Sequence, residues 1–372
     1  MDIQVARFRE VLGLLKPVVP RKTSLPILTN VLLKDGQAMA TDLETMVVIP
    51  VPEVDAPCLF PYTDVVKMLQ YTQGGETLHI EAEPGIVRMS WSEGKSTFNS
   101  KDPDEYPAVV DFKAVAEAAV NGDDLIPAMV SVLPYTASET ARPVLNGVTL
   151  VIGEPFEVAA GDGFRMAYQV LPLSFPQNIT VIVPASSVSA LYHLWEKTPR
   201  TPPVSDDLIP VIMAKKQVTL GYDGKEGLRF VFGKAATAIV KLVQGSPPAW
   251  LKLIPKEEPA LQSHIMANDL ALAVRRAVAV AADGNDIIRM EFTDSTVKIS
   301  AKGEGQEVES SVKTLATTGA PNKVGLNANY LLNYLSGKEG IVTLALTGGT
   351  SPVMLQHQKN PRVLIMPMQV DW

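Results

Sequence analysis

The chain repeats part of its own sequence, and this repeat constrains the fold more than any other feature. Leu145-Asn146-Gly147-Val148-Thr149-Leu150 is followed by the polar stretch Gly161-Asp162-Gly163-Phe164-Arg165-Met166. An earlier copy consists of Leu28-Thr29-Asn30-Val31-Leu32-Leu33 and then Ala40-Thr41-Asp42-Leu43-Glu44. Each copy predicts a strand, a turn, a second strand and a polar corner, after an amphipathic helix. A repeated supersecondary unit predicts an architecture built by repetition.

Six segments have the apolar spacing of a helix with one buried stripe, and they recur roughly every sixty residues. The apolar positions are Phe8, Val11, Leu12 and Leu15; Val65, Met68 and Leu69; Ile126, Met129, Val130 and Leu133; Val188, Leu191, Tyr192 and Trp195; Leu270, Ala273, Val274 and Ala277; and Ala328, Leu331, Leu332 and Leu335. We expect N-terminal caps at Thr63 and Asp64, at Ser186 or Ser187, at Asn268 and Asp269, and at Asn327.

Between these helices the apolar residues alternate with polar ones, which predicts antiparallel strands. Hairpins are expected over residues 77–91, 217–232 and 288–300. The pattern therefore predicts an α+β fold of three repeated domains, each with two helix-plus-antiparallel-sheet units. Proline-punctuated stretches at 101–107 and 245–259 mark the boundaries, giving domains 1–116, 117–257 and 258–372.

The composition is that of an ordinary soluble protein, with 46% hydrophobic and 20% charged residues. No apolar run approaches the ~18 residues of a membrane span, and the residues after Met1 do not form a signal-peptide pattern. The single cysteine, Cys58, fits a reducing compartment, so a cytoplasmic location is expected. The net charge of −7 argues against an overall basic nucleic-acid-binding surface, but not against a protein that surrounds nucleic acid with a positive inner face.

No constellation of residues in the sequence predicts catalysis, a cofactor or a metal. The phosphate-binding loop and the nucleophile-elbow motif are missing, and the histidines share no metal-ligand spacing: His79, His193, His264 and His357. Residues 283–286 resemble the start of a calcium loop, but a turn is the better interpretation because Ile287 and Ile288 stand where ligands belong. At Gly161-Asp162-Gly163 a tight strand connection is favoured over a phosphate site.

Basic residues recur on the predicted helices or just after them: Arg9, Lys16, Arg21, Lys22, Lys67, Lys197, Arg200, Arg275 and Arg276. Solvated helix faces explain any one of them equally well. If the sheets close outward into a ring, however, the helices face inward and these charges line one channel. Contacts from such a channel to phosphates would be independent of base sequence and sensitive to salt.

Several short motifs have a common order and spacing: Leu25-Pro26-Ile27-Leu28, Leu145-Asn146-Gly147-Val148, Asp162-Gly163-Phe164-Arg165-Met166-Ala167, Asn327-Ala328-Asn329-Tyr330-Leu331-Leu332 and Met366-Pro367-Met368. In this order the chain resembles the bacterial DNA polymerase III β subunits, the sliding clamps, along its whole length. The resemblance implies a DNA-clamp fold and a non-catalytic homodimer that closes as a ring around duplex DNA. It also implies that the ring tethers the polymerase III α subunit, clamp-loader subunits and other motif-bearing proteins.

The resemblance further implies roles for individual residues. In such a ring, the basic residues above other than Lys16 are the expected DNA contacts, because they recur on the predicted helices. Our candidates for the dimer interface are Phe98, Val278 and Val280. A peptide-binding cleft would comprise Leu145, Gly163, Phe164, Arg165, Met166, Pro248, Lys252, Leu253, Asn327, Tyr330, Pro352, Leu364, Met366, Pro367 and Met368. Without the resemblance, residues 366–368 would be interpreted as an ordinary final strand.

The sequence departs from the family pattern at a few positions. Phe164 replaces a histidine, Gln369 replaces a basic residue, Asn285 stands near a usually apolar position, and Trp372 lies beyond the usual end. These departures bear on partner preference more than on fold. A clamp-fold protein that binds peptides without being loaded on DNA is therefore the alternative function.

Overall fold

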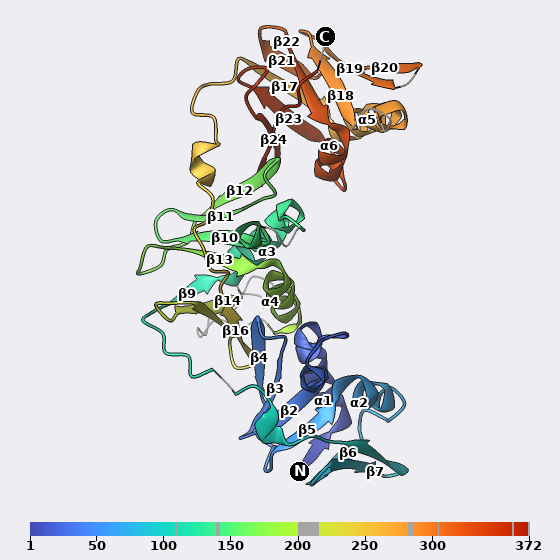
Figure 1. Ribbon diagram of the computed structural model, residues 1–372, viewed down its shortest axis with the longest axis vertical. Helices are drawn as coiled ribbons and strands as arrows, with labels where there is room; N and C mark the ends of the chain where they lie inside the picture. Colours follow the sequence, from blue (N-terminus) through green and yellow to red (C-terminus); the bar gives the residue numbers. More distant parts are fainter. Residues whose placement is uncertain are drawn as a thin grey trace, which may run out of the picture. The chain divides into compact units, whose positions relative to one another are not determined.

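The computed structural model describes residues 1–372 except 109, 139–141, 200–215, 282–285, 304, 359–360, 371–372 and the side chain of residue 251. The chain forms two compact units, each assembled from segments that are distant in the sequence. Figure 1 shows the helices and strands of the chain, coloured along the sequence. The first unit contains Met1–Val130, Val151–Phe156 and Leu171–Gln244, and the second contains Ser131–Leu150, Glu157–Val170 and Gly245–Trp372. The division into three domains stays a prediction; residue 116 begins a strand, and residue 257 lies in the link before another.

Among its described residues, the first unit contains two antiparallel sheets and four α-helices. One sheet has the order β1 (Asp2–Gln4), β6 (Thr77–Glu83), β7 (Ile86–Trp91), β8 (Gly94–Asn99). The other has the order β5 (Cys58–Pro61), β2 (Asn30–Lys34), β3 (Gln37–Thr41), β4 (Thr45–Pro50), β16 (Ala236–Lys241), β15 (Gly227–Phe232), β14 (Gln217–Tyr222), β9 (Ala116–Asn121). The helices are α1 (Val5–Leu15), α2 (Tyr62–Leu69), α3 (Gly122–Val132) and α4 (Ala185–Lys197), the last preceded by β13 (Ile179–Pro184).

The second unit is built in the same way. In one sheet, β10 (Gly147–Ile152), β11 (Phe156–Gly161), β12 (Arg165–Leu171), β25 (Arg362–Ile365), β24 (Val353–His357), β23 (Ile341–Leu346), β17 (Leu261–Met266) and β21 (Ala316–Gly319) follow one another. The other sheet has the order β20 (Gln306–Lys313), β19 (Thr296–Gly303), β18 (Ile287–Phe292), β22 (Asn322–Asn327). The helices α5 (Ala267–Ala281) and α6 (Ala328–Leu335) pack against each other and against these strands (Figure 1).

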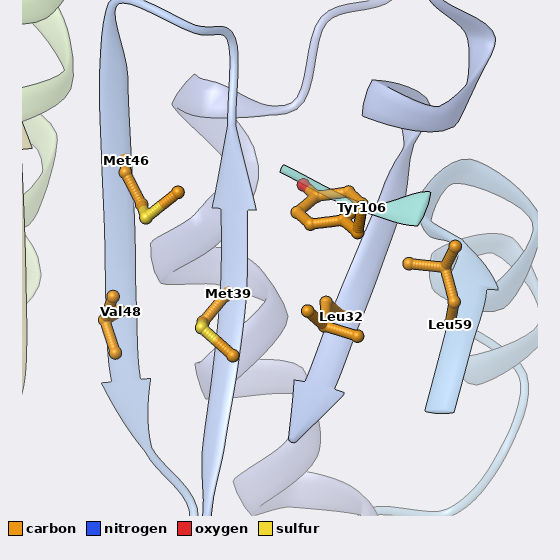
Figure 2. Packing of buried hydrophobic residues seen from close by; sticks show 6 residues of the cluster. All are labelled: Leu32, Met39, Met46, Val48, Leu59 and Tyr106. Atoms are coloured by element: carbon orange, nitrogen blue, oxygen red, sulfur yellow. The ribbon is translucent and has the colours of Figure 1, made fainter. Parts of the chain in front are cut away.

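Helix α1 shows how the sheets acquire a core. Its apolar spacing turns Phe8 toward β5, where the Phe8 and Phe60 ring centroids are 5.7 Å apart. Burying one such side chain contributes about 2 kcal/mol to stability. Since side chains alternate along a strand, Leu59 points to the opposite face. On that face a second buried cluster, which we call the Tyr106 cluster, includes Leu32, Met39, Met46, Val48, Leu59 and Tyr106 (Figure 2).

The helices, the hairpins and the repeat agree with the sequence predictions. All six predicted helices are present, and the three hairpins form as β6–β7, β14–β15 and β18–β19. The two copies of the repeat fold alike: a 3₁₀ turn, Pro26–Thr29 or Pro143–Leu145, precedes β2–β3–β4 or β10–β11–β12. The residues between β3 and β4, and between β11 and β12, form the two polar corners.

The predicted helix caps are mostly wrong. The side chain of Asn327 caps α6 as predicted, since it accepts hydrogen bonds from the Asn329 and Tyr330 amides. The helices α2, α4 and α5 begin at Tyr62, Ala185 and Ala267, so the other predicted caps lie inside helices. The two serines of α4 instead bind the first corner: Ser186 donates to the Glu44 carboxylate, and Ser187 accepts from the Thr45 hydroxyl at 2.7 Å.

The described residues contain neither a membrane-spanning helix nor a cluster of metal ligands. Among the residues that the structure describes, no helix is both long and apolar enough to span a membrane. In the same residues, no group of three or more His, Cys, Asp or Glu side chains is arranged to hold a metal ion. Of the calcium-loop residues considered above, 283–285 lie outside the described part of the chain.

Candidate peptide-binding cleft

The second polar corner is held by the Asp162 side chain. Its Oδ1 accepts hydrogen bonds from the Phe164 and Arg165 amides, both at 3.0 Å. Gly163 has φ +98°, a left-handed conformation that glycine adopts without strain. The corner is therefore a tight strand connection in which the Phe164 and Arg165 amides already have an acceptor, which agrees with the favoured interpretation.

Arg165 joins this corner to two other elements. Its Nε donates to Asp162 Oδ2 at 2.9 Å, and its guanidinium also donates to the Pro134 carbonyl at 3.0 Å. The guanidinium carbon lies 5.3 Å from the Tyr135 ring centroid and 4.7 Å from that of Tyr330. Burial raises the pKa of Tyr135 to about 12, so its hydroxyl stays neutral beside the cation. The Arg165 side chain is thus fixed on the wall of the cleft and is only 11% exposed.

The floor of the cleft is a buried cluster that we call the Trp250 cluster: Leu145, Ala159, Met166, Tyr168, Trp250 and Leu364. Trp250 donates from Nε1 to the Thr149 hydroxyl at 3.1 Å, which satisfies its polar atom inside the cluster. A Cβ on Gly161 would lie 2.7 Å from the Trp250 ring, so glycine is required for this close approach. Trp250 was not among the cleft residues predicted from the sequence, although a large aromatic residue in a proline-rich link was an available signal.

Above this floor lies a small open cavity of about 100 Å³, lined by Gly163, Phe164, Arg165, Met166, Trp250, Leu253, Pro352, Leu364 and Met366. Three of its apolar side chains face solvent: Phe164 is 57% exposed, Leu253 44% and Met366 38%. The Phe164 ring stacks on Tyr330, with centroids 6.3 Å apart. The Met366 amide donates to the Phe164 carbonyl at 2.8 Å, which extends the β12–β25 pairing to the cavity rim. Exposed apolar side chains over a preformed floor suit an apolar peptide.

The structure brings most of the predicted cleft residues together. Eight line the cavity directly: Gly163, Phe164, Arg165, Met166, Leu253, Pro352, Leu364 and Met366. Leu145 lies in the floor and is 6% exposed. Asn327 and Tyr330 begin α6, and the Met368 amide donates to the Gly325 carbonyl of β22 at 2.8 Å. Pro248, Lys252 and Pro367 are not among the lining residues.

The predicted DNA contacts fall into separate groups. Arg9, Arg21 and Lys67, with Lys16, line one hollow of about 630 Å³ between α1 and α2. The Arg9 guanidinium is already engaged, because it donates to the Leu69 and Thr72 carbonyls and so caps the C-terminus of α2. Lys22 and Lys197 are exposed in the first unit, and Arg275 and Arg276 are exposed on α5 of the second. Arg200 lies outside the described residues.

The predicted interface residues lie near unpaired strand edges. Phe98 is half-buried on β8, an edge strand of its sheet. Val278 and Val280 are half-buried in the last turns of α5, which packs on β20, an edge strand of another sheet. Unpaired edges in water favour association with another strand.

The chain is similar to known proteins over part or all of its length. The C-terminal domain of the DNA polymerase III beta subunit family matches residues 251–369. A beta sliding clamp of Caulobacter vibrioides is 25% identical, with 100% of each chain covered. A beta sliding clamp homolog of Streptomyces muensis, GriR, is 24% identical over 73% of this chain and 71% of its own.

A solved DnaN sliding clamp from Pseudomonas aeruginosa, bound to griselimycin, has a TM-score of 0.84 and 22% identity, covering 100% of this chain and 99% of that one. This likeness confirms the predicted clamp fold. Sliding clamps are non-catalytic processivity factors, so the expectation that the chain is not an enzyme is confirmed at the level of the family. Together, the match of residues 251–369 to the family and the similarity of the whole chain to beta sliding clamps support a bacterial DNA polymerase III β subunit, a sliding clamp.

Proposed function

We propose that the chain is a sliding clamp that works as a homodimeric ring around duplex DNA and tethers the replicative polymerase. The observation that carries the proposal is the cleft of the second unit, because it collects exposed apolar side chains over a rigid floor at the residues expected for partner peptides. The polymerase III α subunit and clamp-loader subunits are the proposed partners. Griselimycin bound to a clamp of the same fold supports a role for this family in ligand binding.

DNA would be held without base recognition. The proposed contacts are Arg9, Arg21, Lys22, Lys67, Lys197, Arg200, Arg275 and Arg276. Exposure supports phosphate contacts at Arg21, Lys22, Lys67, Lys197, Arg275 and Arg276. The Arg9 guanidinium already binds two carbonyls, and Arg200 lies outside the described residues. Because a closed ring retains DNA topologically, the net charge of −7 does not oppose this function. The protein should then be retained longer on circular DNA, which has no free ends, than on linear DNA, where only direct contacts hold it.

The ring would close through edge strands. We assign Phe98 on β8 to contact Val278 and Val280 on α5 of the partner subunit, with β8 and β20 pairing across the boundary. Such pairing would remove two exposed strand edges from each subunit.

The test combines mass in solution with retention on circular DNA before and after linearisation. A dimer retained on closed circles and lost from linear DNA is expected. Replacing Lys22, Lys197 and Arg276 together by Ala should lower retention and flatten its salt dependence, since each lost phosphate contact removes about 0.9 from the log–log slope. The matched control replaces Lys225, Lys234 and Lys256, which are also exposed and divided two to one between the units.

The alternative is a clamp-fold protein that binds peptides without being loaded on DNA. Two residues favour this alternative. Phe164 makes the cleft more apolar, and the Arg9 guanidinium is already hydrogen-bonded, which leaves one fewer free cation for DNA. Equal retention on closed and linear DNA, with peptide binding intact, would select this alternative.

A further inference from the structure

The first unit contains a hollow built on the same backbone scaffold as the cleft. Residues Asp42 and Asp162 hold equivalent corners: Asp42 Oδ1 accepts from the Glu44 amide at 3.0 Å and the Thr45 amide at 2.7 Å. Four residues after each aspartate stands a buried methionine, Met46 or Met166. Met46 is paired in register with Ile239 of β16, as Met166 is paired with Leu364 of β25.

The correspondence extends to the main-chain bond at the rim. The Lys241 amide donates to the Glu44 carbonyl at 2.7 Å, as the Met366 amide donates to Phe164 at 2.8 Å. Beneath the corners, the Tyr106 cluster and the Trp250 cluster occupy equivalent places. The Tyr106 hydroxyl accepts from the Thr41 amide at 3.2 Å, at the position where Trp250 approaches Gly161.

The chemistry of the two rims differs. Where the cleft has Phe164 and Met366, the hollow has Glu44 and Lys241. The hollow is about 310 Å³, and its lining includes Leu43, Glu44, Asp223, Glu226, Ile239 and Lys241. Three carboxylates and one ammonium thus border an apolar floor. Within the described part of the chain, none of the ion pairs involves the carboxylates of Glu44, Asp223 or Glu226.

The backbone conformation and the exposure of Leu43 indicate that this surface is a binding site. It has φ +76° at the position where the second corner has Gly163, although a leucine is strained in that conformation. Its side chain is nevertheless 51% exposed at the mouth of the hollow, and Val110 on the opposite segment is 52% exposed. Such strain is retained where a neighbouring element or function requires it.

We propose that this hollow is a second docking site, which takes a short extended peptide carrying one aliphatic anchor and one or more basic side chains. The anchor fits between Leu43 at the mouth and Met46 and Ile239 beneath it, and the basic side chains meet Glu44 and Glu226. That the ligand is a peptide rests on the function proposed for the cleft. Its basic charge and its aliphatic anchor are inferred from the residues that line the hollow. Peptides that lack basic side chains would not complement this acidic rim and would bind the cleft instead.

The test starts from a displayed library of random decapeptides selected on the full-length protein. Enriched peptides are added to protein labelled with ¹³C at the methionine methyl groups, with signals assigned by single Met→Leu variants. Met46 lines the hollow and reports binding there, and Met366 lines the cleft cavity and reports binding there. We expect one class of peptides, basic and aliphatic, to shift Met46 without shifting Met366.

Two variants then test the residues. Leu43→Gly removes the anchor contact while easing the backbone strain, so the protein stays folded and this class should bind at least tenfold more weakly. Glu226→Gln should weaken binding severalfold and reduce its salt dependence, whereas Glu93→Gln on an exposed turn should not. The proposal is overturned if no enriched peptide shifts Met46, if those that do are acidic, or if Leu43→Gly binds them unchanged. If the cleft proposal fails, no enriched peptide would shift the Met366 signal, while the basic and aliphatic peptides would still shift Met46.

Discussion

The guanidinium carbon of Arg165 lies 4.7 Å from the ring centroid of Tyr330, so β12 and α6 meet at the wall of the cleft. The two residues are far apart in the sequence, and the contact depends on the ion pair that fixes Arg165 to Asp162 at 2.9 Å. The same arginine therefore positions the corner and supports the aromatic side chain above it. This double role makes the wall sensitive to a single substitution.

Replacing Arg165 by Met should destabilise the second unit. The change leaves the Asp162 carboxylate, itself 15% exposed, without its cation, and breaking such a buried pair costs about 3 kcal/mol. Urea unfolding monitored by tryptophan fluorescence measures the effect. The control is Arg7→Met, which removes an exposed pair with Glu10 at 3.5 Å and should change the free energy of unfolding by less than about 1 kcal/mol. Equal effects for both variants would show that Arg165 is not a structural anchor.

Truncating the rim of the cleft should weaken partner peptides without unfolding the protein. The probe is a peptide with a Gln, two spaced aliphatic residues and a terminal aromatic, measured by calorimetry. Met366→Ala with Met368→Ala should cost about 2–4 kcal/mol of binding free energy, as truncated hot spots do. Leu145 is a poorer choice, because it is 6% exposed and its truncation would open a cavity in the Trp250 cluster.

The control for this measurement is Met354→Ala on β24, which is not among the cavity-lining residues. Unchanged peptide affinity in the rim variant, with retention on closed DNA intact, would move the partner site away from the cleft.

Charges at the proposed ring interface should give monomers. Phe98→Asp combined with Val280→Asp would bury unpaired carboxylates, at a cost of several kcal/mol per contact. Analytical ultracentrifugation should find a folded monomer at concentrations where the unmodified protein is a dimer. Thr97→Asp, on the same strand at an exposed position, is the control. A double variant that still sediments as a dimer would refute this placement of the interface.

The hydroxyl pair between Thr45 and Ser187 should stabilise the first unit. Both side chains are fully buried, and the Thr45 hydroxyl donates to Ser187 at 2.7 Å. Ser187→Ala should cost about 1–3 kcal/mol, because it leaves the Thr45 hydroxyl without an acceptor. Adding Thr45→Val should recover part of the loss, which a double-mutant cycle in urea unfolding would measure. Ser189→Ala, which removes only an exposed hydroxyl, is the control.

Local patterns determined the elements of this fold. Apolar spacing along α1, α4 and α5, and alternation along the hairpins, are properties of neighbouring residues, so sequence alone locates them. The repeat also predicted two equivalent corners, and both are present at Asp42 and Asp162. The residues of the cleft came from the resemblance to the sliding clamps, because no single motif there is specific by itself.

Only the tertiary structure determined which distant strand lies beside each of the two polar corners. Sequence could not pair Glu44 with Lys241 or Phe164 with Met366, because their strands are separated by about two hundred residues and register depends on the whole sheet. It also missed that Trp250 covers Gly161, that Ser187 binds Thr45 instead of capping α4, and that Arg9 caps α2. In each case a polar or aromatic group satisfies its contacts with a distant segment, and local periodicity carries no information about which segment that is.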